Sequence, residues 1–443
     1  MEGFTHQSKL GGAMKFLTFS VVFAALAFVH SFASAGNGPK GGPSFTDYDW
    51  TEIVETDFSA PDRWEPRAGL QAVELHNHLF VIGGRTPLPP SPPDFNPFAS
   101  LIHGDVWVSP DLGNTWVELL EDAESAGLWK NRAYFEAVTQ GSHMYIMGGQ
   151  NFTTAIPGGP PDFEPIIVPS EFFKDVWRSA DGVNWELMTD EAEWATVPEK
   201  CLGAPGVSQG RAGLSAVSFK GKLWVLGGSQ GDDNSIGGGF DCRELFNDVW
   251  YSKDGSEWQL ATDDAPWEAR AGGVALVKGG WLYYMGGEKG FIGATDYFND
   301  VWRSKDGANW EKVTGGAGWS PRPGHKCSVL ANHFVCMGGF GSPTNPSDIW
   351  VSKDGADWTQ VSSTPWNNDP LSSIFFCDAP PGLICDNIRY DFDMLTVTGG
   401  KGGMKPSIFT FGGDREVFFP IPEGFTPNYL RVENDVWRYS PRD

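Results

Sequence analysis

Short apolar runs separated by turn residues recur along the chain in six similar units. Each unit has one run that ends in Gly-Gly, and these runs read FVIGG, YIMGG, WVLGG, YYMGG, VCMGG and FTFGG. Each unit also has an Arg that begins an apolar run and an Asp-Val-Trp or Asp-Ile-Trp run, and five have a later run with a second Trp. Runs this short, bounded by Gly, Asp, Asn and Pro, are typical of strands. The pattern predicts four strands in each unit.

Eighteen of the twenty tryptophans fall into three series of six and mark the same units. The first series, in the Asp-Val/Ile-Trp runs, comprises Trp107, Trp177, Trp250, Trp302, Trp350 and Trp437. The second follows a tight turn and comprises Trp116, Trp185, Trp258, Trp310, Trp358 and, from the other end of the chain, Trp50. The third precedes the Arg and comprises Trp64, Trp129, Trp194, Trp267, Trp319 and Trp366. A period of roughly 50 to 70 residues with four strands matches one blade of a β-propeller.

The last unit is one strand short. Its third strand contains Trp437, and the chain ends at Asp443, which leaves no room for a fourth strand. The segment DYDWTEIV around Trp50 has no other place and supplies the missing strand from the N-terminal end. Closure of the ring removes an exposed edge. We therefore predict an all-β fold, a six-bladed β-propeller with four antiparallel strands per blade, over residues 46–443.

The Gly-Gly pairs at this spacing are the signature of the kelch repeat. From residue 46 onward the chain resembles the kelch-repeat family of the galactose oxidase/kelch-like superfamily. The turns between third and fourth strands, such as SPDLGNTW from Ser109 and SKDGSEW from Ser252, resemble the Asp-box of sialidase-type propellers. In such turns Asp accepts backbone N–H bonds and Gly takes a positive φ. This second resemblance implies a propeller hairpin and implies no sialidase activity.

The N-terminal segment has the pattern of a secretory leader. Residues 1–35 contain Lys15, an apolar stretch from Phe16 to Val29 and Ala33-Ser34-Ala35 before Gly36, which predicts a signal peptide followed by a short linker over 36–45. Translation starts at Met1 or Met14. The apolar stretch is too short for a membrane span, and no other segment approaches the length needed. We expect a protein that is secreted or exported to an oxidising compartment, with no membrane partner.

The charge of the chain limits its partners. The formal net charge is −24, which argues against nucleic acid and anionic membranes as partners. An acidic surface of this kind also favours solubility, and we expect a monomer.

Six cysteines in an exported chain predict three disulfides. Cys327 and Cys336 lie on consecutive strands across a tight turn and are expected to face each other, and Cys377 and Cys385 share one loop. The remaining pair is Cys201 with Cys242. A metal site is the weaker interpretation, because no CxxC pair and no clustered His accompany these residues. We expect no metal and no cofactor.

Long insertions gather on one rim of the predicted propeller. The connections between second and third strands share a rim with the links between blades, which we call the loop rim; the turns that resemble the Asp-box lie on the opposite rim. The insertions on the loop rim are 85–104, 150–174, 195–210, 229–247, 367–388 and 414–434. Asn151, in Asn-Phe-Thr, is a glycosylation sequon there. Recognition is usually built on such loops.

An Arg begins each innermost strand at the same rim. The six are Arg67, Arg132, Arg211, Arg270, Arg322 and Arg389. Six guanidinium groups at one mouth of the channel predict a positive focus suited to a carboxylate, sulfate or phosphate. The alternative is structural, with each Arg stacked on a neighbouring Trp or paired with an Asp or Glu.

Two units depart from the repeat just after this Arg. Most units read Arg-Ala-Gly or Arg-Pro-Gly, and two positions later have Gln71, Ser215, Val274 or Lys326. The second unit instead has Tyr134 and Glu136, and the sixth has Tyr390, Asp391 and Asp393. A carboxylate beside Arg in a channel of low dielectric constant suits general acid/base catalysis, for which Glu136, Asp391 and Asp393 are the candidates. Buried ion pairs are the alternative. His325, close to Arg322, is a further candidate ligand-binding residue or an ordinary packed histidine.

These patterns predict a protein that binds an anionic or carbohydrate ligand at the mouth of its channel. The predicted ligand-binding residues are the six arginines with Tyr134, His325 and Tyr390. One alternative is an enzyme that epimerises or hydrolyses an acidic sugar or glycan. A second is a protein-interaction scaffold that uses the long loops.

Overall fold

The computed structural model describes residues 44–57, 59, 61–87, 100–151, 170–195, 208–231, 243–290, 296–339, 347–368, 389–399, 403–414 and 432–442. The chain divides into two units, residues 1–41 and 42–443, and every described residue lies in the second. The predicted signal peptide, most of the long insertions, and Cys201, Cys242, Cys377 and Cys385 lie outside the described residues. In the described part of the chain no helix is long and apolar enough to cross a membrane.

The described strands form six four-stranded antiparallel sheets, which confirms the predicted six-bladed propeller. Blade 1 is β2 (Gln71–Leu75), β3 (His78–Pro87), β4 (Ser100–Ser109) and β5 (Val117–Leu120). Blade 2 is β6 (Glu136–Gln140), β7 (His143–Met147), β8 (Val176–Ser179) and β9 (Trp185–Thr189). Blade 3 is β10 (Ser215–Phe219), β11 (Lys222–Leu226), β14 (Val249–Ser252) and β15 (Trp258–Thr262).

The other three blades repeat this plan. Blade 4 is β16 (Val274–Lys278), β17 (Trp281–Met285), β18 (Val301–Ser304) and β19 (Trp310–Thr314). Blade 5 is β20 (His325–Leu330), β21 (His333–Gly338), β22 (Asp348–Ser352) and β23 (Trp358–Ser363). Blade 6 is β24 (Asp393–Val397), β25 (Ser407–Asp414), β26 (Val432–Pro441) and β1 (Tyr48–Val54). A short ribbon, β12 (Ser229–Gln230) with β13 (Glu244–Leu245), and two 3-10 helices, Phe45–Asp47 and Pro365–Asn368, complete the described elements.

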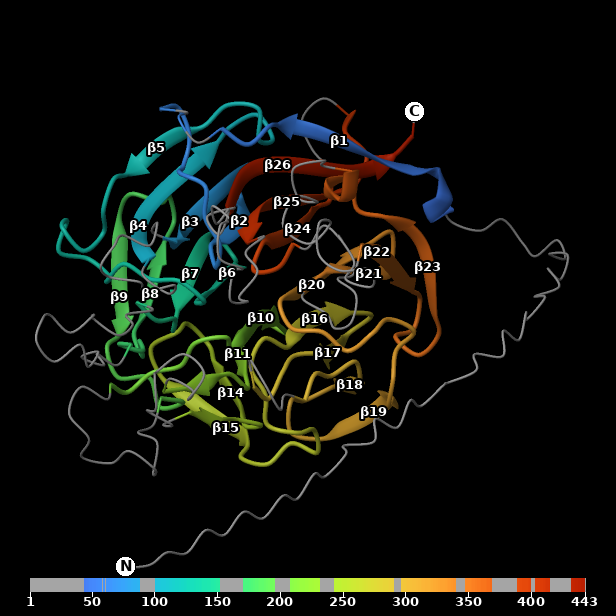
Figure 1. Ribbon diagram of the computed structural model, residues 1–443. Helices are drawn as coiled ribbons and strands as arrows, with labels where there is room; N and C mark the ends of the chain where they lie inside the picture. Colours follow the sequence, from blue (N-terminus) through green and yellow to red (C-terminus); the bar gives the residue numbers. More distant parts are fainter. Residues whose placement is uncertain are drawn as a thin grey trace, which may run out of the picture. The chain divides into compact units, whose positions relative to one another are not determined.

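The N-terminal strand closes the ring as predicted. β1 pairs with β26 in antiparallel register, with Trp50 opposite Tyr439. The innermost strands β2, β6, β10, β16, β20 and β24 surround the axis of the ring, and each contacts the next (Figure 1). The N-terminal segment that leads into blade 1 is therefore hydrogen-bonded to the C-terminal strand of blade 6, and this pairing closes the ring.

Tryptophan pairs hold the blades together. Each third-series Trp is almost fully buried and meets the second-series Trp of its unit edge to face. The ring centroids are 4.5 Å apart in Trp64–Trp116 and 5.6 Å apart in Trp50–Trp366. The same pairing occurs in Trp129–Trp185, Trp194–Trp258, Trp267–Trp310 and Trp319–Trp358. Edge-to-face contact adds to the apolar area that these large rings bury.

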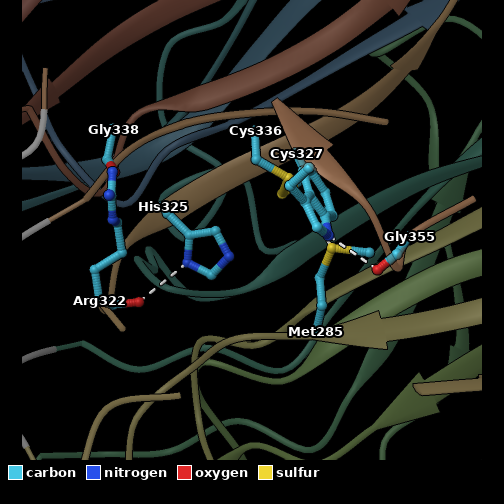
Figure 2. The surroundings of a disulfide bond; sticks show 8 residues. Met285, Arg322, His325, Cys327, Cys336, Gly338 and Gly355 are labelled. Carbon is cyan, nitrogen blue, oxygen red and sulfur yellow. Dashed lines mark hydrogen bonds between the residues drawn. A yellow bond between two sulfur atoms is a disulfide. The ribbon is translucent and has the colours of Figure 1, made fainter. Parts of the chain in front are cut away.

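The predicted disulfide between Cys327 and Cys336 is confirmed. The two residues are directly opposite each other on β20 and β21, with Cα atoms 4.1 Å apart. Both side chains are buried, and Met285 of blade 4 lies beside them (Figure 2).

Candidate functional site

The six arginines each bind inside their own blade. Each of these residues is at most 2% exposed and pairs with the Asp of the Asp-Val/Ile-Trp run. In blade 2 the Nη1 and Nη2 atoms of Arg132 each lie 2.8 Å from an Asp175 oxygen, and Nη1 also donates to the Gly148 carbonyl at 2.9 Å. The Trp177 indole donates to the same Asp175 at 2.7 Å. The other pairs are Arg67–Asp105, Arg211–Asp248, Arg270–Asp300, Arg322–Asp348 and Arg389–Asp435.

In each of these pairs the Asp carboxylate balances the positive charge of the Arg at the mouth of the channel. Burial by itself raises the pKa of Asp105, but the charge and hydrogen bonds of Arg67 bring it below its usual value. Asp175 and Asp348 follow the same pattern with Arg132 and Arg322. Each guanidinium has a structural role: it hydrogen-bonds to the first Gly of the Gly-Gly pair and to the Asp of the Asp-Val/Ile-Trp run, and so links the first three strands of its blade. Each of the six guanidinium charges is thus paired with a carboxylate of its own blade.

The residue two positions after each Arg forms part of a ring around the axis, the mouth ring. Its members have φ between 52° and 64° and are Gly69, Tyr134, Gly213, Gly272, Gly324 and Asp391. Backbone bonds of 2.8 to 3.0 Å run from Gly69 N–H to Asp391, from Tyr134 to Gly69, from Gly213 to Tyr134 and from Gly272 to Gly213. A positive φ favours glycine. Tyr134 therefore adopts a conformation that its side chain disfavours, and Asp391 adopts one that Asp accepts more readily than most residues but less readily than glycine.

A hydrogen-bond network that includes the buried Arg85 and Asp414 holds these two side chains in place. Arg85 donates from Nε to the Tyr134 hydroxyl at 2.8 Å and from Nη2 to Asp414 at 2.6 Å. Tyr134 is also hydrogen-bonded to Asp391. Burial raises the pKa of Asp391 to about 6; the Asp414 carboxylate adds to the shift and Arg85 opposes it. The network joins blades 6, 1 and 2 at the mouth.

Sequence reasoning missed Arg85 and Asp414. Both side chains are almost fully buried, and each directly follows Gly-Gly in its blade. The signal was present as a charged residue directly after Gly-Gly, which the first, fourth and last units have as Arg85, Glu288 and Asp414. Tyr390 was predicted as a ligand-binding residue; it is buried, and its backbone N–H donates to the Asp414 carbonyl at 3.1 Å.

His325 packs between blades 4 and 5. It is 2% exposed, its ring centroid lies 5.0 Å from that of Trp319, and its Nδ1 is 3.2 Å from the Arg322 carbonyl oxygen (Figure 2). Burial, with the Arg322 charge, lowers the pKa of His325 to about 3, so the ring is neutral at physiological pH. A Cβ on Gly286 would lie 2.2 Å from this ring, so the histidine fills the space over that glycine.

Four positions after each Arg, the innermost strands carry a second ring, the channel belt. Its members are Gln71, Glu136, Ser215, Val274, Lys326 and Asp393. It brings two predicted catalytic residues, Glu136 and Asp393, to one level of the channel, where Lys326 of blade 5 supplies a positive charge. The Lys326 Nζ lies 3.4 Å from Asp393 Oδ1.

The belt side chains also fasten each blade to the next. Asp393 accepts the Ala72 N–H at 2.6 Å, and Gln71 accepts the Ala137 N–H at 3.0 Å. Glu136 accepts a backbone bond from Ala216 in the same way. These bonds satisfy donors on the inner edges of the sheets and fix the direction of the belt carboxylates.

The belt is charge-balanced at neutral pH. Burial raises the pKa of Glu136 to about 8; Lys326 opposes this shift and Asp393 adds to it. Glu136 is therefore mostly protonated at pH 7 and has a hydroxyl hydrogen to donate. Burial lowers the pKa of Lys326, but the neighbouring acidic groups, above all Asp393, oppose this effect and the net shift is upward, so Lys326 stays charged. One Lys–Asp ion pair and one neutral carboxyl group result.

Two cavities meet at the belt. The larger, about 660 Å³, is lined by innermost-strand residues from the belt toward the turns at the opposite rim. The smaller, about 80 Å³, is lined by the mouth ring and the belt. Glu136 and Lys326 face both. Within the described residues no cluster of three or more His, Cys, Asp or Glu side chains is placed to hold a metal ion.

By its fold the protein is a six-bladed β-propeller, and polar side chains of its innermost strands form a belt inside the central channel. No model of a known protein family and no curated protein sequence matches the chain.

Proposed function

We propose that the chain is a kelch-type propeller. The support is the repeated unit itself. A Gly-Gly pair lies in or directly after the second strand of each blade, and the Arg sixteen residues earlier in the first five blades donates to the first Gly carbonyl, as Arg132 does to Gly148. The turns that resemble the Asp-box also fit. In the turn of blade 2, Asp181 accepts the N–H groups of Val183 and Asn184, and Trp185 donates to the Gly182 carbonyl.

We propose that the protein binds a small neutral polyhydroxylated ligand, of carbohydrate type, in the central channel. The observation that carries this is the channel belt, where a neutral carboxyl, an ion pair and an amide are held in fixed directions around a cavity of about 660 Å³. Cavities of roughly 300–1,000 Å³ with a few converging polar groups are typical of ligand sites. The pairing of the six arginines favours a neutral sugar over an anionic ligand.

Calorimetric titration of the purified protein with neutral, uronic and sulfated saccharides tests this function. We expect neutral saccharides to bind at pH 7. Because Gln mimics a protonated Glu, Glu136→Gln should keep affinity within about threefold, whereas Glu136→Leu should weaken it about tenfold or more, or roughly 1.4 kcal/mol. Glu186→Gln, on the outer strand β9, is the matched control and should bind like the unchanged protein. Binding of sulfated or uronic saccharides alone, or of none, would contradict the proposal.

Acid/base catalysis on the bound sugar is the second candidate function. The protonated Glu136 beside the Lys326–Asp393 pair favours it, because one group is set to give a proton and another to accept one. In that case Glu136→Gln should retain binding and lose turnover by about a hundredfold or more. A protein-interaction role would use insertions that lie outside the described residues. Export is supported by the disulfide between Cys327 and Cys336.

A further inference from the structure

We infer that the channel is a one-ended site whose ligand enters from the rim of the hairpin turns, opposite to the rim that carries the long insertions. The hairpin rim carries the turns that join first and second strands, such as His76-Asn77 and Ala331-Asn332. The ligand class rests on the proposed function, but the direction of entry rests on the channel wall alone. It reverses the expectation, drawn from loop lengths, that recognition takes place on the loop rim.

The mouth ring forms the closed end. Consecutive members from Asp391 through Gly272 are joined by backbone hydrogen bonds of 2.8 to 3.0 Å. Hydrogen-bonded backbones in paired strands keep their Cα atoms about 5 Å apart, so a circle of six has a radius of only about 5 Å. The main-chain atoms themselves occupy much of such a circle. The cavity at this level is accordingly only about 80 Å³.

Side chains reduce the opening further at two places. The Tyr134 ring lies over Gly69, where an added Cβ would come within 3.2 Å of it. Among the described backbone bonds none continues the ring through Gly324. On its Asp391 side the space is filled, because a Cβ on Gly324 would lie 2.9 Å from the Cβ of Tyr390 and 3.0 Å from Asp391 Oδ1. The end wall is therefore made by the two non-glycine members of the ring and their neighbours.

The unfavourable backbone of Tyr134 and Asp391 fits this role. Four blades use glycine at the same position, and glycine would adopt the conformation without strain. The two exceptions are fixed by Arg85, which binds Tyr134 at 2.8 Å and Asp414 at 2.6 Å. A strained conformation persists where the surroundings hold it and often marks a functional position. Here the strained residues place bulk over the narrow end of the channel.

The opposite end is wide. The cavity of about 660 Å³ runs along the innermost strands to residues close to the hairpin turns. Seven positions after each Arg, the strands carry half-buried side chains that line this cavity: Glu74, Thr139, Ser218, Val277, Val329 and Thr396. Three of these side chains carry hydroxyl groups, two are valines and one is a carboxylate, so the wall offers both polar and apolar surface to a sugar. Among the described backbone bonds, none joins successive innermost strands into a ring at this end, as those of the mouth ring do at the other.

Thiol labelling tests the direction of entry without any ligand. Val274 lines both cavities at the belt, and Val274→Cys places a thiol there. N-ethylmaleimide should label this variant, with the unchanged protein as the background. Adding Thr139→Trp, near the hairpin rim, should slow labelling about tenfold or more.

The matched change at the other end is Gly272→Asn, because Asn tolerates a positive φ and nothing lies within 4 Å of a Cβ there. It should alter the rate by less than about twofold.

Two results would overturn the inference. One is the opposite pattern, in which Gly272→Asn slows labelling and Thr139→Trp does not. The other is a complete lack of labelling in the Val274→Cys variant. Circular dichroism and melting temperature would confirm that each variant is folded, and Ser218→Trp would replace Thr139→Trp if that variant were not. As a last arm, Tyr134→Gly added to the blocked Thr139→Trp variant should restore labelling by opening the end wall. Because no saccharide takes part, failure of this test is separate from failure of the proposed ligand class.

Discussion

At the scale of single residues, the same residue type has different roles at different positions of the blade. The repeated Arg is a constituent of its own blade, because it meets a carboxylate, a glycine carbonyl and, through the carboxylate, an indole. Arg85, which is not part of the repeat, connects neighbouring blades through Tyr134 and Asp414. Residue type and local sequence alone do not separate these cases, since the partners come from distant segments.

The repeated pairs should be essential for stability. Arg132→Met removes a fully buried guanidinium and leaves the largely buried Asp175 carboxylate without its partner, and we expect the free energy of unfolding to fall by about 3 kcal/mol or more. Arg178→Met breaks the exposed pair with Glu186 and should cost less than about 1 kcal/mol. Urea unfolding of both variants is the measurement. Equal losses in the two variants would show that the buried pair has no special weight.

The protonation of Glu136 predicts how stability depends on pH. Its pKa is about 8 in the folded protein and is ordinarily about 4.5, so between these pH values the folded form binds a proton that the unfolded form has released. The free energy of unfolding therefore decreases as pH rises through this window, by at most about 1.4 kcal/mol per pH unit. Glu136→Gln removes this contribution, so the variant should gain stability relative to the unchanged protein between pH 5.5 and pH 8.

Urea unfolding at both pH values measures this effect, with Glu186→Gln as a control that should follow the unchanged protein. A constant difference between Glu136→Gln and the unchanged protein at the two pH values would contradict the raised pKa.

At the scale of elements, the decisive feature is the strand supplied by the N-terminal end. β1 covers the outer edge of β26 and places Trp50 against Trp366 and Tyr439. Each other blade obtains this fourth strand from its own unit. The sequence predicted the arrangement because one Trp was missing from the last unit and one was left over before the first.

Removal of β1 should therefore destabilise the whole propeller. A chain that begins at Glu55 exposes the edge of β26 and loses the Trp50–Trp366 contact, and we expect a lower melting temperature together with self-association through the bare edge. A chain that begins at Ser44 retains the strand and is the control. Differential scanning calorimetry and size-exclusion chromatography are the measurements. A monomer with an unchanged melting temperature would show that closure is not required.

At the scale of the whole propeller, the ring creates sites that no single blade contains. The belt combines one side chain from each blade, and its ion pair joins blades 5 and 6. The mouth ring depends on bonds between successive blades. The sequence showed the unusual residues at these positions, Tyr134, Glu136, Asp391 and Asp393, because they broke the repeat. It placed Lys326 at the equivalent position of the fifth unit, but it did not show that the Lys326 ammonium would pair with Asp393.

The sequence by itself determined the number of blades, the strands of each blade, the closing strand and the Cys327–Cys336 pair, because all of these follow from short-range periodicity and from turns within one unit. The tertiary structure alone decided what the charged residues do. Whether a guanidinium faces a ligand or a carboxylate depends on which distant side chain lies within about 3 Å of it, and a carboxyl group's pKa depends on how far the assembled ring removes it from water. Those quantities exist only after six units have closed around a common axis.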